Sequence, residues 1–171
     1  MSSKSDVQQF KQEDISDALD HLSRIFSLPD GLKSEQRKAL TLFLQGHDLF
    51  ISLPTGFGKS VIFQGAHLCM DFLRAKNEDP DVARSVVIVV MPLKSLVADQ
   101  LQKASNLHIE VADLSGGLTD TIQEGLHAGK YSLILASPET LLEDGREIFN
   151  IPSVRENLCG IFVEGHCVDK W

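Results

Sequence analysis

The sequence predicts an α/β fold in which helices cover both faces of a parallel sheet. Short apolar segments with the character of buried strands occur at residues 49–53, 86–91, 109–112, 132–136 and 160–163. Helical spacing in the segments between them favours a parallel sheet between two layers of helices. In such sheets the binding site lies at the carboxyl ends of the strands. Four strands are followed there by polar or Gly/Pro-containing segments, at residues 54–60, 92–95, 137–140 and 164–167.

Two helices are predicted before the first strand. Apolar residues at helical spacing predict a helix over residues 14–27, after a polar tail at residues 1–12. A second helix is predicted to begin at the cap Ser34 and to end at Gly46. For the domain organisation we expect a flexible N-terminal segment at residues 1–21. Residues 22–171 then form one domain, the natural expectation for a chain of 171 residues.

Local signals place further helices between the later strands. One helix is predicted to begin near Lys59, and another to span residues 93–101. The run Thr121-Ile122-Gln123-Glu124 has the pattern of a capping box. Ser137 followed by Pro138 predicts the start of a short helix, with proline at its first position.

Composition indicates an intracellular protein with a real core. Hydrophobic residues make up 43% of the chain, which excludes a disordered protein. The longest apolar run, residues 86–91, is too short to cross a membrane, and the N-terminus lacks the apolar segment of a signal peptide. The three cysteines, Cys69, Cys159 and Cys167, form no Cys-x-x-Cys pair. We therefore expect a reducing compartment, no disulfide framework and no zinc site.

The net charge of −8 argues against a broad basic surface. Nucleic-acid binding depends on local positive charge at the phosphates. A DNA path on this chain would therefore be narrow and built by backbone amides and a few side chains, or it would be supplied by a part outside this sequence.

The segment Leu53-Pro54-Thr55-Gly56-Phe57-Gly58-Lys59-Ser60 has the pattern of a phosphate-binding loop between a strand and a helix. Gly56 and Gly58 allow backbone amides to turn toward an anion, and the helix that follows aims its positive end at the same point. Lys59 is predicted to reach the terminal phosphates of ATP, and Ser60 to ligate Mg²⁺. The alternative is a glycine-rich turn with a surface lysine. The stricter pattern wants glycine at position 53, so this is the variant Thr-Gly-x-Gly-Lys-Ser, and the fold class is a P-loop NTPase of the RecA-like type.

Several segments in the same order resemble the RecQ family of superfamily-two helicases over about residues 22–171. Lys33-Ser34-Glu35-Gln36 is similar to the family's adenine-reading segment, which implies a base contact by Gln36 and a nucleotide contact by Lys33. The run of residues 91–100 resembles motif Ia, and Ser137-Pro138-Glu139 resembles motif Ib. The resemblance implies that Pro92, Ser95, Ser137 and Pro138 lie at the backbone of single-stranded or forked DNA. Simple helix caps are the alternative for these residues.

Residues 164–171 resemble motif II and the start of the aromatic loop after it. By that resemblance Glu164 orients or deprotonates the attacking water, His166 couples the ATP site to DNA, and Trp171 stacks on a base. Where the family has Asp, this chain has Val163, which cannot ligate a cation. We therefore expect bound Mg²⁺–ATP but impaired hydrolysis.

The family's next strand and its second motor domain would follow residue 171, so the sheet is expected to be incomplete. The resemblance implies the ATP-binding first motor domain of an ATP-dependent 3′–5′ DNA helicase that does not unwind DNA alone. It also implies a location in the nucleus, if the organism is eukaryotic, or otherwise in the cytoplasm. Two alternatives remain open: a catalytically dead nucleotide-binding relic or interaction module, and a P-loop ATPase without a nucleic-acid role.

Overall fold

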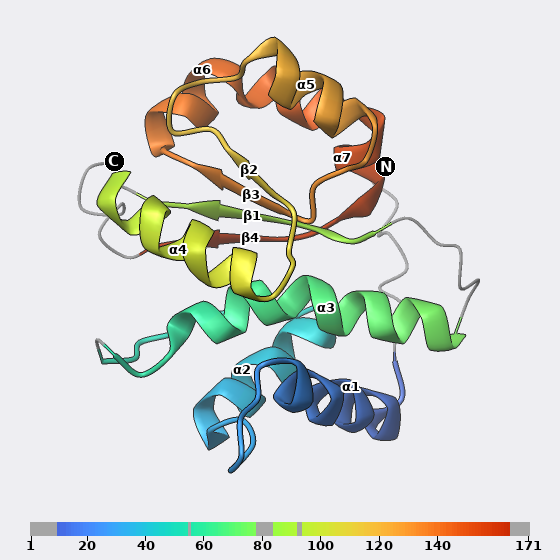
Figure 1. Cartoon of the computed structure of the whole chain (residues 1–171). Coiled ribbons are helices and arrows are strands. Elements are labelled where there is room, and N and C mark those ends of the chain that lie inside the picture. The colour runs from blue at the N-terminus through green and yellow to red at the C-terminus, as the bar shows by residue number, and fades with distance from the viewer. Residues whose placement is uncertain (1–9, 55, 78–83, 92–93, 165–171) are drawn as a thin grey trace. The chain divides into compact units, whose positions relative to one another are not determined.

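The structure, a computed structural model, describes residues 10–54, 56–77, 84–91 and 94–164. The chain divides into two compact units, Met1–Asp81 and Val82–Trp171, and each is described by itself. The described part of the first unit is helical, whereas that of the second contains a sheet and four helices (Figure 1). Within the described residues no helix combines the length and apolar character needed to span a membrane.

Three helices pack together in the first unit: α1 (Gln12–Ile25), α2 (Ser34–Leu44) and α3 (Lys59–Asn77). Each buries an apolar face, so this unit has a core of its own. At Gly65 the packing of α3 is close, because a Cβ atom there would lie 2.5 Å from Leu22 Cδ2 of α1. Glycine at this position therefore allows α1 and α3 to approach each other.

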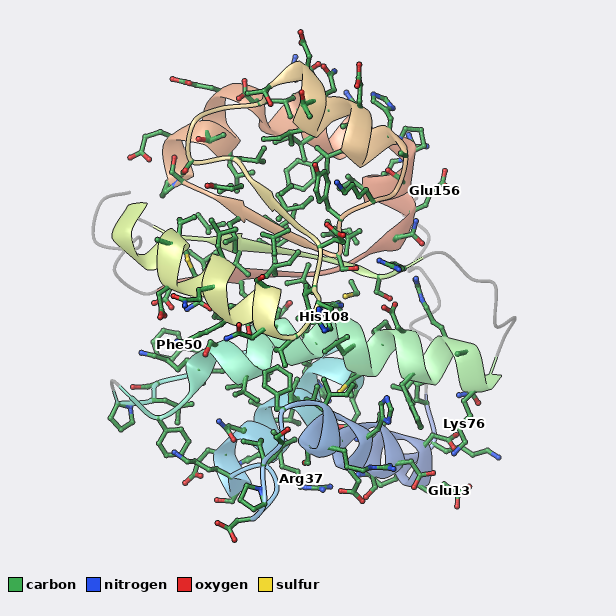
Figure 2. All side chains as sticks on the ribbon, viewed as in Figure 1. Glu13, Arg37, Phe50, Lys76, His108 and Glu156 are labelled. Atoms are coloured by element: carbon green, nitrogen blue, oxygen red, sulfur yellow. The ribbon has the colours of Figure 1, made fainter. Side chains whose placement is uncertain are left out.

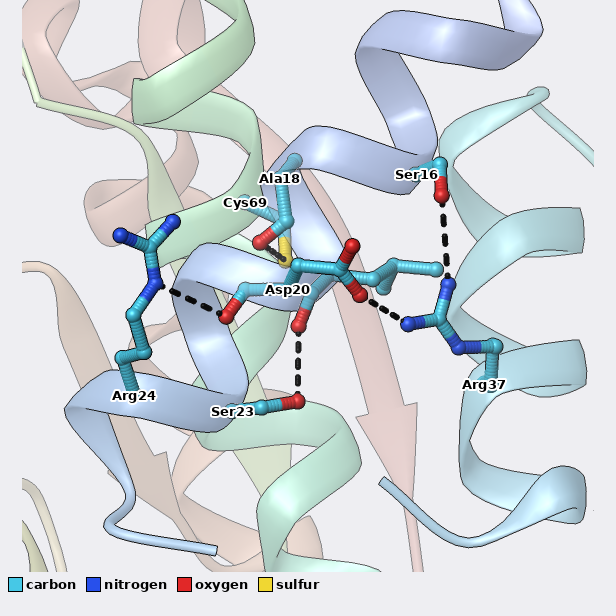
Figure 3. Close-up of polar contacts among 8 residues, drawn as sticks. Ser16, Ala18, Asp20, Ser23, Arg24, Arg37 and Cys69 are labelled. Carbon is cyan, nitrogen blue, oxygen red and sulfur yellow. Dashed lines mark hydrogen bonds and ion pairs between the residues drawn. The ribbon is translucent and has the colours of Figure 1, made fainter. Parts of the chain in front are cut away.

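Polar contacts also hold α1 in place (Figure 3). The guanidinium group of Arg37, on α2, donates hydrogen bonds to the Asp20 carboxylate and to the Ser16 hydroxyl. On α3, the thiol of Cys69 lies 3.8 Å from the carbonyl oxygen of Ala18. The predicted helix over residues 14–27 is thus confirmed, although it begins at Gln12. The flexible segment expected for residues 1–21 is helical from that point, and the expected boundary after residue 21 falls inside α1, because Ile15, Ala18 and Leu19 are buried.

The predicted strand at residues 49–53 is wrong, because these residues are not in any strand. A strand needs a neighbour for its backbone hydrogen bonds, and the described residues of this unit form no other strand. Phe50, labelled in Figure 2, is 95% exposed, so its side chain is not in a core. The segment nevertheless leads into α3, as predicted.

The start of α2 also differs from the prediction. Ser34 is the first helical residue rather than the cap, and its hydroxyl donates to the Glu35 carboxylate. The cap position belongs to Lys33, whose backbone amide donates to the Gln36 side chain. Gly46 follows the helix with φ +81°, which fits the predicted glycine end.

The second unit contains a parallel sheet of four strands in the order β2-β3-β1-β4. The strands are β1 (Val86–Val90), β2 (Val111–Asp113), β3 (Leu133–Ala136) and β4 (Leu158–Val163). The helices are α4 (Lys94–Asn106), α5 (Asp120–His127), α6 (Pro138–Asn150) and α7 (Pro152–Asn157). Helices α5, α6 and α7 lie on one face of the sheet, and α4 lies on the other (Figure 1). The predicted α/β architecture is confirmed.

Four of the five predicted strands are confirmed within a few residues. Their apolar side chains explain this success, since β1 and β3 are buried at every position. On one face Ile88 and Ile134 pack with residues of the covering helices, among them Leu126, Ile148 and Val154. Of the predicted helix starts, Ser137 with Pro138 is confirmed, whereas α5 is capped by Thr119 rather than by Thr121.

Three strands end at the same level of the sheet. Val90 of β1 is in register with Ala136 of β3 and with Val163 of β4. The residues after β1 and β4 continue the ladder, because Met91 N donates to Ala136 O and Glu164 N donates to Val90 O. The carboxyl edge therefore brings Ser137 and Glu164 to either side of Met91, as the sequence predicted for its polar segments.

Candidate functional site

The glycine-rich loop before α3 turns sharply at two residues. Gly56 has φ +79° and Gly58 has φ +94°, a region of backbone conformation that side chains disfavour. A Cβ atom on Gly58 would also lie 2.7 Å from Gln36 Nε2. Helix α3 then begins at Lys59, so the predicted loop-to-helix transition is confirmed. Ser60 follows as the second residue of the helix.

The ammonium group of Lys59 folds back onto its own loop. Its Nζ atom lies 3.2 Å from the carbonyl oxygen of Leu53, six residues earlier. The amide of Phe57 donates to Pro54 O over 3.2 Å, which closes a turn inside the same segment. The loop itself therefore supplies the hydrogen-bond partner of the Lys59 ammonium, which is Leu53 O.

Gln36 is buried against the loop, with only 3% of its surface exposed. Its Oε1 atom accepts from Lys33 N over 2.9 Å, which satisfies one free amide at the start of α2. Its Nε2 atom donates to Gly58 O over 3.0 Å and lies 3.4 Å from Phe57 O. The amide that the resemblance assigns to the adenine edge is therefore engaged with the loop.

Lys33 contacts the loop through Phe57. Its Nζ atom donates to Phe57 O over 3.0 Å and lies 4.3 Å from the centroid of the Phe57 ring. Phe57 is not among the predicted site residues, because it occupies the variable position of the loop pattern. An aromatic residue between two glycines was the available signal. Lys33, Gln36, Gly56, Gly58, Lys59 and Ser60 thus all lie at or beside one loop.

At the edge of the sheet in the second unit, Ser137 caps α6. Its Oγ atom accepts from Thr140 N over 3.1 Å and lies 3.0 Å from Thr140 Oγ1. Because the single hydroxyl hydrogen of Thr140 is donated to Leu114 O, Ser137 must donate to Thr140 Oγ1. The Ser137 hydroxyl therefore has no hydrogen left for a phosphate oxygen. Pro138 at the next position has no amide hydrogen to offer either.

Asp144 is a further residue that the sequence analysis overlooked at this edge. Its Oδ2 atom accepts from Leu118 N over 3.1 Å, and Thr140 Oγ1 donates to Leu114 O over 3.1 Å. The two side chains of α6 fix both ends of the turn that follows β2. No local sequence pattern predicts these two hydrogen bonds, because each joins residues that are 26 positions apart.

Val163 and Glu164 occupy the motif II positions at the end of β4. Val163 is 52% exposed, and Glu164 is half-buried. Consecutive side chains of an extended segment point to opposite faces, so Glu164 does not replace the carboxylate missing at position 163. Within residues 10–164, where they are described, no group of three or more His, Cys, Asp or Glu side chains is placed to hold a metal ion.

Some of the predicted residues lie in parts of the chain that the structure does not describe. Thr55, Pro92, His166 and Trp171 lie outside the described residues, and Ser95 is in α4 but its side chain is not described. The residues around the loop belong to the first unit, whereas Ser137, Pro138 and Glu164 belong to the second. The loop precedes a helix as predicted but does not follow a strand, whereas Ser137, Pro138 and Glu164 lie at the carboxyl ends of their strands as predicted.

The parallel sheet covered by helices in one unit, and the Thr-Gly-Phe-Gly-Lys-Ser loop that leads into a helix in the other, are each features of the P-loop NTPase class. The model of the DEAD/DEAH box helicase family matches residues 33–171, and the chain belongs to this family.

Curated relatives of the chain are RecQ-like helicases. The RecQ-like DNA helicase BLM of Xenopus laevis is 30% identical over 162 residues, which cover 88% of this chain and 11% of the relative. The ATP-dependent DNA helicase Q-like SIM of Arabidopsis thaliana is 31% identical over 141 residues, covering 82% of this chain and 15% of the relative. The ATP-dependent DNA helicase RecQ of Haemophilus influenzae is 28% identical over 159 residues, covering 90% and 23% respectively. The chain therefore spans less than a quarter of the length of these three relatives.

Proposed function

We propose that this chain contains the ATP-binding first motor domain of a RecQ-like ATP-dependent DNA helicase. The observation that carries this proposal is the loop before α3, where Gly56 and Gly58 have positive φ angles and Lys59 folds over the turn. Family membership and the similarity to RecQ-like helicases support it.

ATP would be held mainly through its phosphates. Backbone amides of the loop and the first turn of α3 favour negative charge, and Lys59 would exchange Leu53 O for a phosphate oxygen. Ser60 would ligate the divalent cation, which we propose to be Mg²⁺, and this ion neutralises phosphate charge when it is bound. The loop fits such an ion through the Ser60 hydroxyl, whereas Val163, at the position where the RecQ family has Asp, has no side-chain oxygen.

Gln36 is our candidate for base recognition. Its amide has the donor and acceptor that an adenine edge requires, and it lies directly beside the loop. Base contact would require Nε2 to exchange Gly58 O for the nucleotide. Recognition of adenine would therefore require the hydrogen bond between Gln36 Nε2 and Gly58 O to break.

Single-stranded or forked DNA is the proposed polymer, and 3′–5′ movement is proposed from the RecQ resemblance. The carboxyl edge with Ser137, Pro138 and Glu164 is the candidate face. Since the Ser137 hydroxyl is engaged in its cap, we propose that this residue shapes the edge. Backbone amides, together with Pro92 and Ser95, would then contact the DNA backbone. One motor domain does not translocate alone, so these residues by themselves are not expected to unwind DNA.

A second candidate is a nucleotide-binding relic or interaction module. Val163 favours it, since Glu164 is left as the only carboxylate of the pair and cannot both hold a cation and activate water. Hydrolysis stimulated by single-stranded DNA supports the motor, whereas nucleotide binding without hydrolysis supports the relic. Hydrolysis that is indifferent to DNA supports an ATPase of another kind.

The binding experiment uses a fluorescent ATP analogue with Mg²⁺ and the 171-residue chain. Lys59→Ala removes a charged hydrogen-bond donor, so we expect its affinity to be weaker by on the order of tenfold or more. Lys38→Ala is the matched control, because Lys38 is an exposed lysine of α2 in the same unit. Equal affinity of Lys59→Ala and wild type for the ATP analogue would contradict the proposal that this loop binds phosphate.

A further inference from the structure

Lys33 contacts the phosphate loop through one residue, and it does so in two ways. The Nζ atom donates to the carbonyl oxygen of Phe57 over 3.0 Å, and the same ammonium lies 4.3 Å from the centroid of the Phe57 ring. A cation over an aromatic face is attracted by the negative charge of the ring. Backbone and side chain of Phe57 are therefore held by a single group, 24 residues away in sequence.

Phe57 stands where the loop changes direction. It lies between the two glycines with positive φ, and its own amide closes a turn with Pro54 O. The neighbouring carbonyl oxygen, that of Gly58, accepts from Gln36. The start of α2 thus holds two consecutive carbonyl oxygens of the loop, and fixing them restricts the conformation of the backbone between them.

We propose that Lys33 is a positioning residue of the phosphate loop, which acts on Phe57 and so on the binding of the phosphate chain rather than on the base. This inference rests on the proposed function, because it assumes that the loop binds a nucleotide. Lys33 would hold the loop in its binding conformation without touching the base. A residue that pre-organises a site in this way changes the affinity of every ligand of that site by the same factor.

The choice of probe separates positioning from base reading. We would measure the affinities of ATP, GTP and inorganic tripolyphosphate, each with Mg²⁺, by competition with the fluorescent ATP analogue. A residue that touches the base affects ATP alone, because tripolyphosphate has no base and GTP presents a different edge. A residue that positions the loop affects all three ligands by one factor.

The variants test both contacts of Lys33. Lys33→Met keeps most of the side-chain length without the charge, and we expect all three affinities to fall by about tenfold. Phe57→Leu removes only the ring, so about threefold is expected, and it should have no further effect in a Lys33→Met background. Lys33→Arg keeps a cation and hydrogen-bond donors and should restore most of the affinity. Lys38→Met, on the same helix, should bind like wild type, and circular dichroism should show that every variant is folded.

Two results would overturn the inference while leaving the proposed function intact. One is a loss confined to ATP in Lys33→Met, which would make Lys33 a base-reading residue. The other is unchanged affinity in Lys33→Met while Lys59→Ala still weakens binding. By contrast, a wild-type chain that binds none of the three ligands would remove the proposed function itself, and the inference with it.

Discussion

The side-chain amide of Gln36 and the carbonyl oxygen of Gly58 are joined by a hydrogen bond of 3.0 Å that links the start of α2 to the loop before α3. The same side chain accepts from the amide of Lys33 over 2.9 Å. One buried residue therefore completes the N-terminus of a helix and fixes a loop 22 residues further along the chain. Folding of α2 and the shape of the loop are coupled through it.

Replacement of Gln36 by leucine is expected to lower the stability of the chain. Leucine has a similar size but cannot accept from Lys33 N or donate to Gly58 O, which then keeps only its hydrogen bond from Val61 N. Loss of a partner for a buried polar group costs about 1–3 kcal/mol. Urea unfolding would measure the change. Gln102→Leu, at an exposed position of α4, should stay within about 0.5 kcal/mol of wild type. Equal stability of both variants would contradict the role given to Gln36.

The two loop glycines should respond differently to alanine. Both have positive φ angles, so each Gly→Ala change strains the backbone by about 1–2 kcal/mol. At Gly56 no atom lies within 4 Å of the added Cβ, whereas at Gly58 that Cβ would meet Gln36 Nε2 at 2.7 Å. We expect Gly58→Ala to be less stable than Gly56→Ala in urea unfolding. Equal stability of the two variants would mean that Gln36 moves aside without cost.

The sheet was predictable because its signals are local. The apolar side chains of β1 and β3 are contiguous in sequence and buried on both faces of the sheet. The start of α6 is predicted by residue type alone, since Ser137 is a common helix cap and Pro138 a common first helical residue. Residues 49–53 have the same apolar character but are not a strand, since pairing depends on a neighbour that no local pattern describes.

The loop was predictable as a pattern, but its contacts were not. Gly56, Gly58 and Lys59 follow from the spacing of residue types, and the structure places all three at the start of α3. The engagement of Gln36 and Lys33 with the loop depends on how two helices pack, so a sequence reading could assign these residues only to the nucleotide. Tertiary contacts over more than 20 residues carry no periodic signal.

Lys76 should make the stability of the chain depend on alkaline pH. Its ammonium, near the end of α3 (Figure 2), lies 2.5 Å from Asp14 Oδ1 and 2.8 Å from Asp17 Oδ2. These hydrogen bonds, first that of Asp14, raise the pKa of Lys76 above its ordinary value near 10.5. The folded state thus favours the protonated lysine. Its contribution is complete below about pH 10.4 and is lost as the pH rises through the raised pKa of the folded state.

Melting temperatures of wild type and Lys76→Met between pH 9 and pH 12 would measure this contribution. We expect wild type to be the more stable at pH 9 and the difference to narrow as the pH rises above about 10.4. Added salt should reduce the difference at pH 9, because Lys76 is partly exposed and its ion pairs are screened. Lys38→Met should follow wild type throughout. A difference that stays constant up to pH 12 and in high salt would show that Lys76 acts by packing alone.

Val163→Asp should leave the fold intact and restore hydrolysis. Because Val163 is 52% exposed at the end of β4, an aspartate there keeps its hydration, and the free energy of unfolding should change by less than about 0.5 kcal/mol. In a chain that carries both motor domains, the new carboxylate would supply the metal ligand beside Glu164, so we expect faster ATP hydrolysis. Ile161→Asp is the matched control, since Ile161 is 49% exposed and lies two residues earlier on the same face of β4. An equal rise in both variants would point to a general effect of negative charge, and no rise in Val163→Asp would show that the missing carboxylate does not limit the reaction.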